Sequence, residues 1–234
     1  MMIAAAVALL LLAPASTAAA PGESVADLPI TEVVATVGTS DTFAVIVSGD
    51  GGWVSIDRKI AGVFATRGVP TAGVNALQYF WEKKTPDQAG ADLARIVRHY
   101  LRAWKKDKVL LIGFSRGADT LPFMASRLPP DLAARVRLVA LLAPARETEL
   151  EFHLADWLRD SRSRTQLAVK PEVEKLTGFE VHCFHGKDEA DSLCPDLSAT
   201  IATPHVFGGG HHFDGQYRSI AKTILDEADL GRTP

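Results

Sequence analysis

Apolar residues along this chain fall into short unbroken runs that alternate with longer segments of helical periodicity. The runs predict strands within residues 31–37, 43–49, 68–77, 109–113, 136–144, 180–186 and 204–209. Unbroken apolar strands that alternate with amphipathic helices are typical of a parallel sheet with both faces covered. The pattern therefore predicts an α/β fold with three layers, α/β/α, around a mostly parallel sheet.

Two segments show the three-and-four spacing of an amphipathic helix. The first covers residues 87–104, between the third and fourth strands, with Thr85 or Asp87 as alternatives for its cap. The second follows the last strand over residues 214–228, and Asp214 is its expected cap. Each helix has one apolar face, so each is expected to pack against the sheet.

The remaining segments define the expected domain organisation. Residues 1–20 join an apolar run to small residues, which is typical of a secretory signal peptide, with an uncleaved anchor as the alternative. Residues 21–42 are an N-terminal segment with the first strand, and residues 43–230 form one domain. The charged insertion 145–178 is interpreted as a lid over the active end of the sheet or as an ordinary crossover helix.

The net charge and the two cysteines indicate which partners and which cellular compartment to expect. A net charge of -3 provides no general cationic field, so a nucleic-acid partner is not expected. Cys183 and Cys194 are the two cysteines, and an oxidising periplasm favours a disulfide between them, with two free thiols as the alternative. A metal site on His182, Cys183 and His185 is not favoured, because successive strand residues point to opposite faces.

The motif with the most chemical content is Gly113-Phe114-Ser115-Arg116-Gly117, directly after an apolar strand. It fits G-x-S-x-G, the nucleophile elbow in which a serine stands at a sharp turn between a strand and a helix. Larger side chains at the two glycines are expected to clash with neighbouring elements. Ser115 is therefore the candidate nucleophile.

A serine nucleophile needs a base and an acid that orients the base. In elbow-type hydrolases the acid follows a strand after the nucleophile, and here the loop after residues 180–186 offers Asp188, Glu189, Asp191 and Asp196. The D-S-L-C-P segment at residues 191–195 favours Asp191, because it is similar to the D-x-x-V-P pattern that commonly follows this strand in elbow-type hydrolases. A count of three residues past the strand favours Glu189 instead, and Asp188 is a further alternate.

The base and the oxyanion hole are expected in two glycine-rich loops. After the last strand, the run GGG precedes His211 and His212, and the distance to the following helix favours His211 over His212 as the base. Two backbone N–H groups should hold the oxyanion, one from Arg116 and one from the loop at residues 48–53, where Asp50 is the expected donor. This chemistry needs no cofactor and no metal.

Four blocks in order resemble the VirJ/AcvB family of bacterial virulence proteins. They are SGDGGW at residues 48–53, G-x-S-x-G-A-D-x-L-P-F from Gly113, D-S-x-C-P from Asp191 and GGHHFDG at residues 209–215. The resemblance covers roughly residues 43–228 and is to the short, single-domain form. It implies a periplasmic α/β-hydrolase with Ser115 as nucleophile, His211 or His212 as base and an acid within residues 188–191.

The resemblance also implies an activity. The family hydrolyses aminoacylated phosphatidylglycerol, notably the lysyl ester, and in plant-associated bacteria it is linked to type IV secretion. We therefore expect a periplasmic serine ester hydrolase with a membrane lipid as substrate, whose lysyl ammonium meets Asp50 or a loop acid. The alternatives are a general esterase or thioesterase, and a non-catalytic periplasmic partner of a type IV secretion system.

Overall fold

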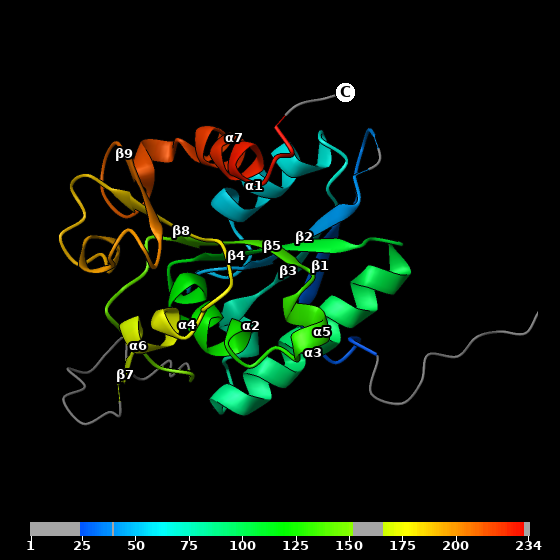
Figure 1. The fold of residues 1–234 in the computed structure, drawn as a ribbon, viewed down its shortest axis with the longest axis horizontal. Helices are drawn as coiled ribbons and strands as arrows, with labels where there is room; N and C mark the ends of the chain where they lie inside the picture. Colours follow the sequence, from blue (N-terminus) through cyan, green and yellow to red (C-terminus); the bar gives the residue numbers. More distant parts are fainter. Residues whose placement is uncertain (1–23, 39, 152–165, 232–234) are drawn as a thin grey trace, which may run out of the picture.

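The computed structural model describes residues 24–38, 40–151 and 166–231 (Figure 1). Within them, a seven-stranded sheet has the order β1-β3-β2-β4-β5-β8-β9. Its strands are β1 (Ile30–Val33), β2 (Thr42–Val47), β3 (Thr71–Val74), β4 (Lys108–Phe114), β5 (Val136–Leu142), β8 (Val181–Gly186) and β9 (Thr203–Phe207). Strand β1 pairs antiparallel with β3, and the other neighbouring pairs are parallel.

Helices cover both faces of this sheet (Figure 1). One face carries α1 (Ser55–Ala65) and α7 (Tyr217–Glu227), which contact each other. The other face carries α2 (Ala76–Tyr79), α3 (Pro86–Ala103), α4 (Arg116–Ala125), α5 (Pro130–Ala133) and α6 (Lys170–Glu174). The predicted three-layer α/β/α architecture is confirmed.

Strand β4 shows why the sheet is buried on both sides. Val109 and Leu111 pack into the core cluster under α3 and α4, whereas Leu110 and Ile112 pack into the cluster under α1 and α7. All four side chains are fully buried, and burying one such side chain stabilises the fold by about 1.5–3 kcal/mol. Alternate side chains of β4 therefore pack into the two cores on opposite faces of the sheet. Because β4 is also the middle strand of the sheet, its end lies at the centre of the sheet edge.

The start of α3 agrees with one of its two predicted caps, whereas the start of α7 does not agree with its predicted cap. Thr85 caps α3, since its hydroxyl accepts the amide proton of Gln88 at 3.2 Å and the Gln88 side chain accepts that of Thr85 at 2.8 Å. Helix α7 begins at Tyr217 and not at Asp214. Asp214 has a φ of 49° within the short 3-10 turn η3 (Phe213–Gly215), so the predicted cap is wrong.

The predicted disulfide is present between Cys183, in β8, and Cys194, at the start of the 3-10 turn η2 (Cys194–Asp196). The bond closes the loop that follows β8. That loop contains the acidic candidates at 188, 189 and 191, so the disulfide fixes both ends of the segment that supplies the acid.

Parts of the predicted organisation fall outside the described residues. These are the signal peptide at residues 1–20 and the middle of the insertion, residues 152–165. The described flanks of the insertion pair as β6 (Glu147–Thr148) with β7 (Leu167–Ala168), and Glu172 of α6 bonds Arg127 at 3.0 Å. The lid interpretation stays a prediction. Among the described residues, no helix has the length and apolar character that a membrane span requires.

Candidate active site

Ser115 stands at the sharp turn between the end of β4 and the start of α4. Its φ of 54° lies in the left-handed region, which is unusual for any residue other than glycine and is typical of a strained functional turn. Two backbone bonds hold the turn, from Ser115 N to Leu142 O at 2.9 Å and from Asp119 N to Ser115 O at 3.0 Å. This geometry is that of a nucleophile elbow.

The two glycines of the motif are required by close backbone contacts. A Cβ atom built on Gly113 would lie 2.3 Å from the carbonyl oxygen of Gly117, and one built on Gly117 would lie 2.0 Å from that of Val47. Both distances are far below van der Waals contact. The predicted clash is confirmed, and it explains how α4 approaches β2 and β4 closely enough to present the serine.

Three side chains from separate strand ends meet at the elbow. Nε2 of His211 lies 2.8 Å from Oγ of Ser115, and Nδ1 of His211 lies 2.5 Å from Oε1 of Glu189. Glu189 follows β8 and His211 follows β9, so both come from the carboxyl ends of parallel strands, as Ser115 does. The tautomer assigned from these contacts donates Nδ1–H to Glu189 and leaves Nε2 to accept the serine proton.

The geometry selects Glu189 over the favoured Asp191 as the partner of the histidine. A tight turn, with Glu189 N bonded to Gly186 O at 3.1 Å, brings the third residue past the strand back over the end of β8. The second carboxylate oxygen of Glu189 accepts the Gly186 amide at 3.3 Å. Asp188 and Asp191 are both exposed. The charge of Asp191 acts on Arg146, whose pKa it helps to raise. The structure therefore brings Glu189, and not the favoured Asp191, into contact with the histidine, because the chain turns back three residues after the strand. The role of this acid stays a prediction.

Of the two adjacent histidines, the structure brings His211 to the serine. His212 packs its ring against those of Phe114 and His211, with centroid distances of 5.8 and 5.4 Å. It also precedes the 3-10 turn η3 as its capping residue. The histidine that the distance to the following helix favoured is therefore the one in contact with Ser115. Its role as the base stays a prediction.

The two predicted oxyanion donors border the serine. A Cβ atom on Gly49 would lie 3.2 Å from Cβ of Ser115, so the loop that contains Asp50 packs directly against the elbow. Gly52, with a φ of 73°, turns this loop back to bond the Gly49 carbonyl at 3.0 Å. Arg116 is the first residue of α4, where the helix itself supplies no acceptor for the amide. The role of these amides in holding an oxyanion stays a prediction.

The side chain of Arg116 adds a contact that the sequence did not predict. Its guanidinium forms an ion pair with the Asp50 carboxylate and donates to the carbonyls of Glu149 at 2.9 Å and Glu151 at 3.3 Å. One residue therefore links the elbow, the glycine loop and the start of the insertion. The carboxylate of Asp50 is partly neutralised by this pair.

Asp119 is a second feature that sequence reasoning missed. It lies one helical turn after the elbow and is buried, and its Oδ1 accepts the amide of Ala145 at 2.6 Å. Burial raises the pKa of this carboxyl to about 7, while the nearby Arg116 and His211 charges oppose that rise. The G-A-D block after the elbow was the available signal, because an aspartate at that helical position lies close to the serine.

The charges around His211 favour its protonated form. The hydrogen bond that His211 donates to Glu189 raises the pKa of the imidazole, burial works against this, and the carboxylates of Glu189, Asp119 and Asp50 add to the rise. A base that is stabilised as an imidazolium can hold the proton that it takes from a serine.

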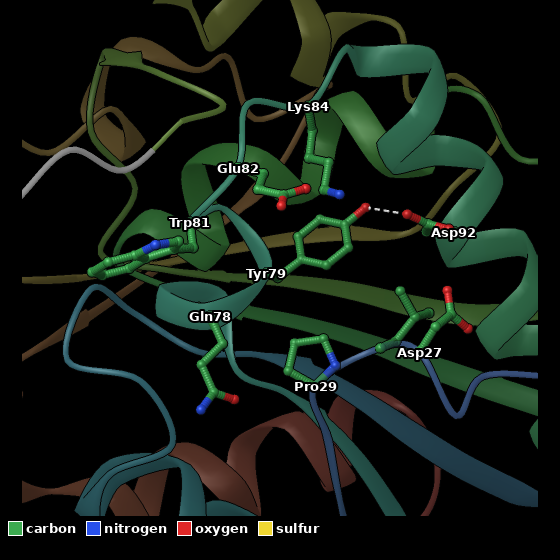
Figure 2. Close-up of a pocket in the computed structure, with 9 residues that line it drawn as sticks. Asp27, Pro29, Gln78, Tyr79, Trp81, Glu82, Lys84 and Asp92 are labelled. Carbon is green, nitrogen blue, oxygen red and sulfur yellow. Dashed lines mark hydrogen bonds between the residues drawn. The ribbon is translucent and has the colours of Figure 1, made fainter.

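A separate cavity of about 410 Å³ lies beside α2 (Figure 2). It is lined by Asp27, Leu28, Pro29, Gln78, Tyr79, Trp81, Glu82, Lys84 and Asp92. Tyr79 donates its hydroxyl to Asp92 at 2.7 Å across the cavity, as Figure 2 shows. The residues around Ser115 are not part of this cavity, so it is not where the serine would act.

Comparison with known proteins places this arrangement in a context. The model of the family described as bacterial virulence protein (VirJ) matches residues 41–231. Among curated protein sequences, none matches this chain.

Several solved structures share the fold. Est1E from Butyrivibrio proteoclasticus with ferulic acid bound has 12% identity and a TM-score of 0.59, with 84% of this chain and 93% of that chain covered. MenH from S. aureus has 10% identity and a TM-score of 0.61, with 86% and 98% covered. XC6422 from Xanthomonas campestris, described as a member of the α/β serine hydrolases without lid, has 14% identity and a TM-score of 0.56, with 88% and 90% covered. At these identities the likeness shows the fold, which is that of the α/β-hydrolases.

Proposed function

This chain belongs to the VirJ family of bacterial virulence proteins, and from that premise we propose that it is an exported serine hydrolase that cleaves the aminoacyl ester of lysyl-phosphatidylglycerol. The observation that carries the enzymatic part is the continuous contact from Ser115 through His211 to Glu189, at 2.8 and 2.5 Å. A serine with a base and an orienting acid in this geometry is the arrangement that acyl transfer requires.

The steps follow from the positions of the groups. Oγ of Ser115 attacks the ester carbonyl while Nε2 of His211 takes its proton, and Glu189 stabilises the imidazolium. The amides of Asp50 and Arg116 hold the oxyanion. The imidazolium then gives its proton to the departing glycerol oxygen, which leaves a lysyl ester on Ser115. Water, deprotonated by His211, attacks that ester and releases lysine.

The charge of the site supports an ammonium-bearing acyl group. Three carboxyl side chains, from Asp50, Asp119 and Glu189, surround the serine and histidine, and the Arg116 guanidinium pairs with one of them. Because Arg116 offsets the charge of Asp50 and burial raises the pKa of Asp119 to about 7, the attraction of this cluster for a positively charged acyl group increases with pH as Asp119 ionises. Because Asp50 is paired with Arg116, a contact between the lysyl ammonium and Asp50 alone is not the arrangement that we propose.

The compartment is part of the proposal. The Cys183–Cys194 disulfide supports export, because such bonds persist in oxidising compartments. The signal peptide lies outside the described residues, and its small-residue pattern supports cleavage near residues 18–20. A periplasmic enzyme would meet its lipid substrate at the outer face of the inner membrane.

A general esterase is the second candidate. His211 is partly open to solvent, at 43% of its side chain, so the reacting groups are accessible to acyl groups other than lysine. A non-catalytic partner of a type IV secretion system is less well supported, since a protein that binds without catalysis has no need to keep the three side chains in contact.

The experiment compares the wild-type mature chain with Ser115→Ala on vesicles that contain lysyl-phosphatidylglycerol, and it follows free lysine. Release by the wild type alone is the expected result. A fluorophosphonate probe is applied to the same samples. Labelling of Ser115 without lysine release would replace the lipid proposal with the general esterase, and neither release nor labelling would favour the binding partner.

A further inference from the structure

A second group of polar side chains lies toward the opposite ends of the parallel strands from the end at which Ser115 stands. His182 is in β8, His205 is in β9 and Glu227 is the last residue of α7. One ligand atom of each lies within 4.8 Å of the other two. The register pairs His182 with Thr203 near the beginnings of the two parallel strands, whereas Glu189 and His211 follow their ends.

The contacts within this cluster leave ring nitrogens facing one another. Nδ1 of His182 is 2.8 Å from Nε2 of His205, which is in turn 3.9 Å from Oε1 of Glu227. On its other side, Nε2 of His182 lies 3.1 Å from Oε1 of Glu180. When Nε2–H donates to this carboxylate, Nδ1 carries a lone pair that points into the cluster.

Packing holds the two rings in place. The side chain of His182 is 2% exposed and lies on the same face of β8 as Phe184, toward α7. The ring of His205 stacks on that of Phe184, with centroids 4.4 Å apart and planes 13° apart. His182 is buried and His205 is half-buried, at 15% exposure of its side chain, and the two imidazoles lie between the carboxylates of Glu180 and Glu227. Two imidazoles held beside a carboxylate in this way provide nitrogen and oxygen ligands suited to a cation.

We propose that His182, His205 and Glu227 form a binding site for Zn²⁺, with Glu180 as the carboxylate that orients His182. Imidazole nitrogens with one carboxylate suit zinc better than magnesium or calcium, which prefer oxygen ligands alone. Tetrahedral zinc with bonds of about 2.0–2.1 Å places its ligand atoms roughly 3.3 Å apart. The two nitrogens then separate by about half an ångström, and the carboxylate of Glu227, whose side chain is 39% exposed, moves in by up to about 1.5 Å, since the ligand atoms of the cluster lie within 4.8 Å of one another.

The site joins three elements that matter for the serine. Strand β8 leads into the loop with Glu189, β9 leads into the loop with His211, and α7 lies with α1 on one face of the sheet (Figure 1). β9 is the last strand of the sheet and pairs with β8 alone among the strands of the described residues. A metal that ties β9 to β8 and α7 therefore stabilises the part of the fold that delivers the acid and the base, without contact with the reacting atoms.

The test uses the purified, disulfide-bonded mature chain after treatment with a chelator. Titration with ZnCl₂ in a calorimeter is expected to show one ion per chain, and saturating Zn²⁺ is expected to raise the Tm. Glu227→Gln keeps the shape of a partly exposed side chain but removes the carboxylate, so it should weaken zinc binding by roughly tenfold or more. His205→Gln should weaken it similarly or further.

Two histidine variants serve as controls. His185→Gln changes another histidine of β8, whose Nδ1 contacts the carbonyl of Gly186, and it should leave zinc binding unchanged. His211→Gln tests whether zinc binds at the serine instead, and it too should leave the affinity unchanged.

Cobalt gives an independent readout, since Co²⁺ in a site with imidazole ligands absorbs in the visible range, and Glu227→Gln should require a roughly tenfold or higher Co²⁺ concentration to reach the same absorption. The proposal is overturned by a wild type that takes up no zinc and shows no change in Tm. It is also overturned if His211→Gln loses the ion while Glu227→Gln and His205→Gln keep it. If His205→Gln does not fold, the result with Glu227→Gln decides.

Discussion

Glu189 holds the imidazole of His211 at 2.5 Å and is the main cause of the raised pKa of that histidine. The base must be neutral to accept the serine proton, so activity should fall as the pH drops below this raised pKa. Glu189→Gln removes the carboxylate charge, so the acidic limb of the pH–rate profile should move to lower pH. It also weakens the orientation of the ring, and kcat should drop by about 10³–10⁴.

The measurement is a pH–rate profile of both proteins on one ester substrate, with Asp191→Asn as the matched control. Asp191 is exposed and lies near Arg146, so its variant should keep the wild-type profile. A large loss in Asp191→Asn with little change in Glu189→Gln would contradict the assignment of the acid.

The same pair of acids shows what sequence can predict at the scale of a residue. The serine and the histidine follow from motif and order along the chain, because each is the chemically suitable group at its strand end. The acid was open among three nearby carboxylates, since the choice depends on whether the chain turns back after three residues or five. The turn that bonds Glu189 to Gly186 decides this, and its geometry is not encoded in residue type.

At the scale of elements, the packing of α4 onto the sheet depends on Gly117. A Cβ atom there would lie 2.0 Å from the carbonyl of Val47, so Gly117→Ala must push α4 away from β2. We expect a loss of about 3 kcal/mol or more in the free energy of unfolding, since overpacking against backbone relaxes poorly. Activity should fall as well, because the displaced helix carries the serine. Urea unfolding with an ester assay measures both effects.

Gly62→Ala is the matched control for this substitution. Gly62 lies on the exposed side of α1, and a Cβ atom there meets nothing within 4 Å. Alanine in a helix interior is favoured over glycine by about 0.5–1 kcal/mol, so this variant should be slightly more stable than the wild type. Equal effects of the two substitutions would contradict the close-contact explanation.

The elements themselves were predicted well where periodicity was strong, and less well where turns intervene. The apolar runs predicted all the strands of the main sheet. The signal is clearest for the inner strands, which are buried on both faces, whereas the edge strands β1 and β9 are largely exposed. The start of α7 was misplaced because Asp214 adopts a left-handed conformation in a separate turn. The pairing of β8 with β9 brings His205 to His182, and no motif in the sequence marks this contact, which depends on the register of the two strands.

At the scale of the whole molecule, the strand order positions the site. The serine follows β4 at the centre of the sheet, and the acid and base follow β8 and β9 at one edge, so one side of the elbow is built from neighbouring parallel strands. Chain order alone predicted that these groups belong together. It could not predict Asp119, Arg116 and Asp50 as a charged cluster, because their contacts depend on how the glycine loop and the insertion pack around the elbow.

That cluster makes the stability of the whole molecule depend on pH. Burial raises the pKa of Asp119 from 3.8 to about 7, so the folded chain keeps a proton there between these values that the unfolded chain has lost. The free energy of unfolding must therefore fall as the pH rises through this window, by at most ~1.4 kcal/mol per pH unit from this group. Asp57, whose pKa is raised to about 6, contributes in the same direction.

Asp119→Asn removes the titrating group but keeps an oxygen that can accept the amide of Ala145. Its free energy of unfolding should change less between about pH 5 and about pH 7 than that of the wild type, so the variant gains relative stability toward neutral pH. Asp57 and His211 still titrate in both proteins, so a residual slope is expected. Urea unfolding across this range checks it, and parallel curves for the two proteins would show that Asp119 is already ionised at the lower pH.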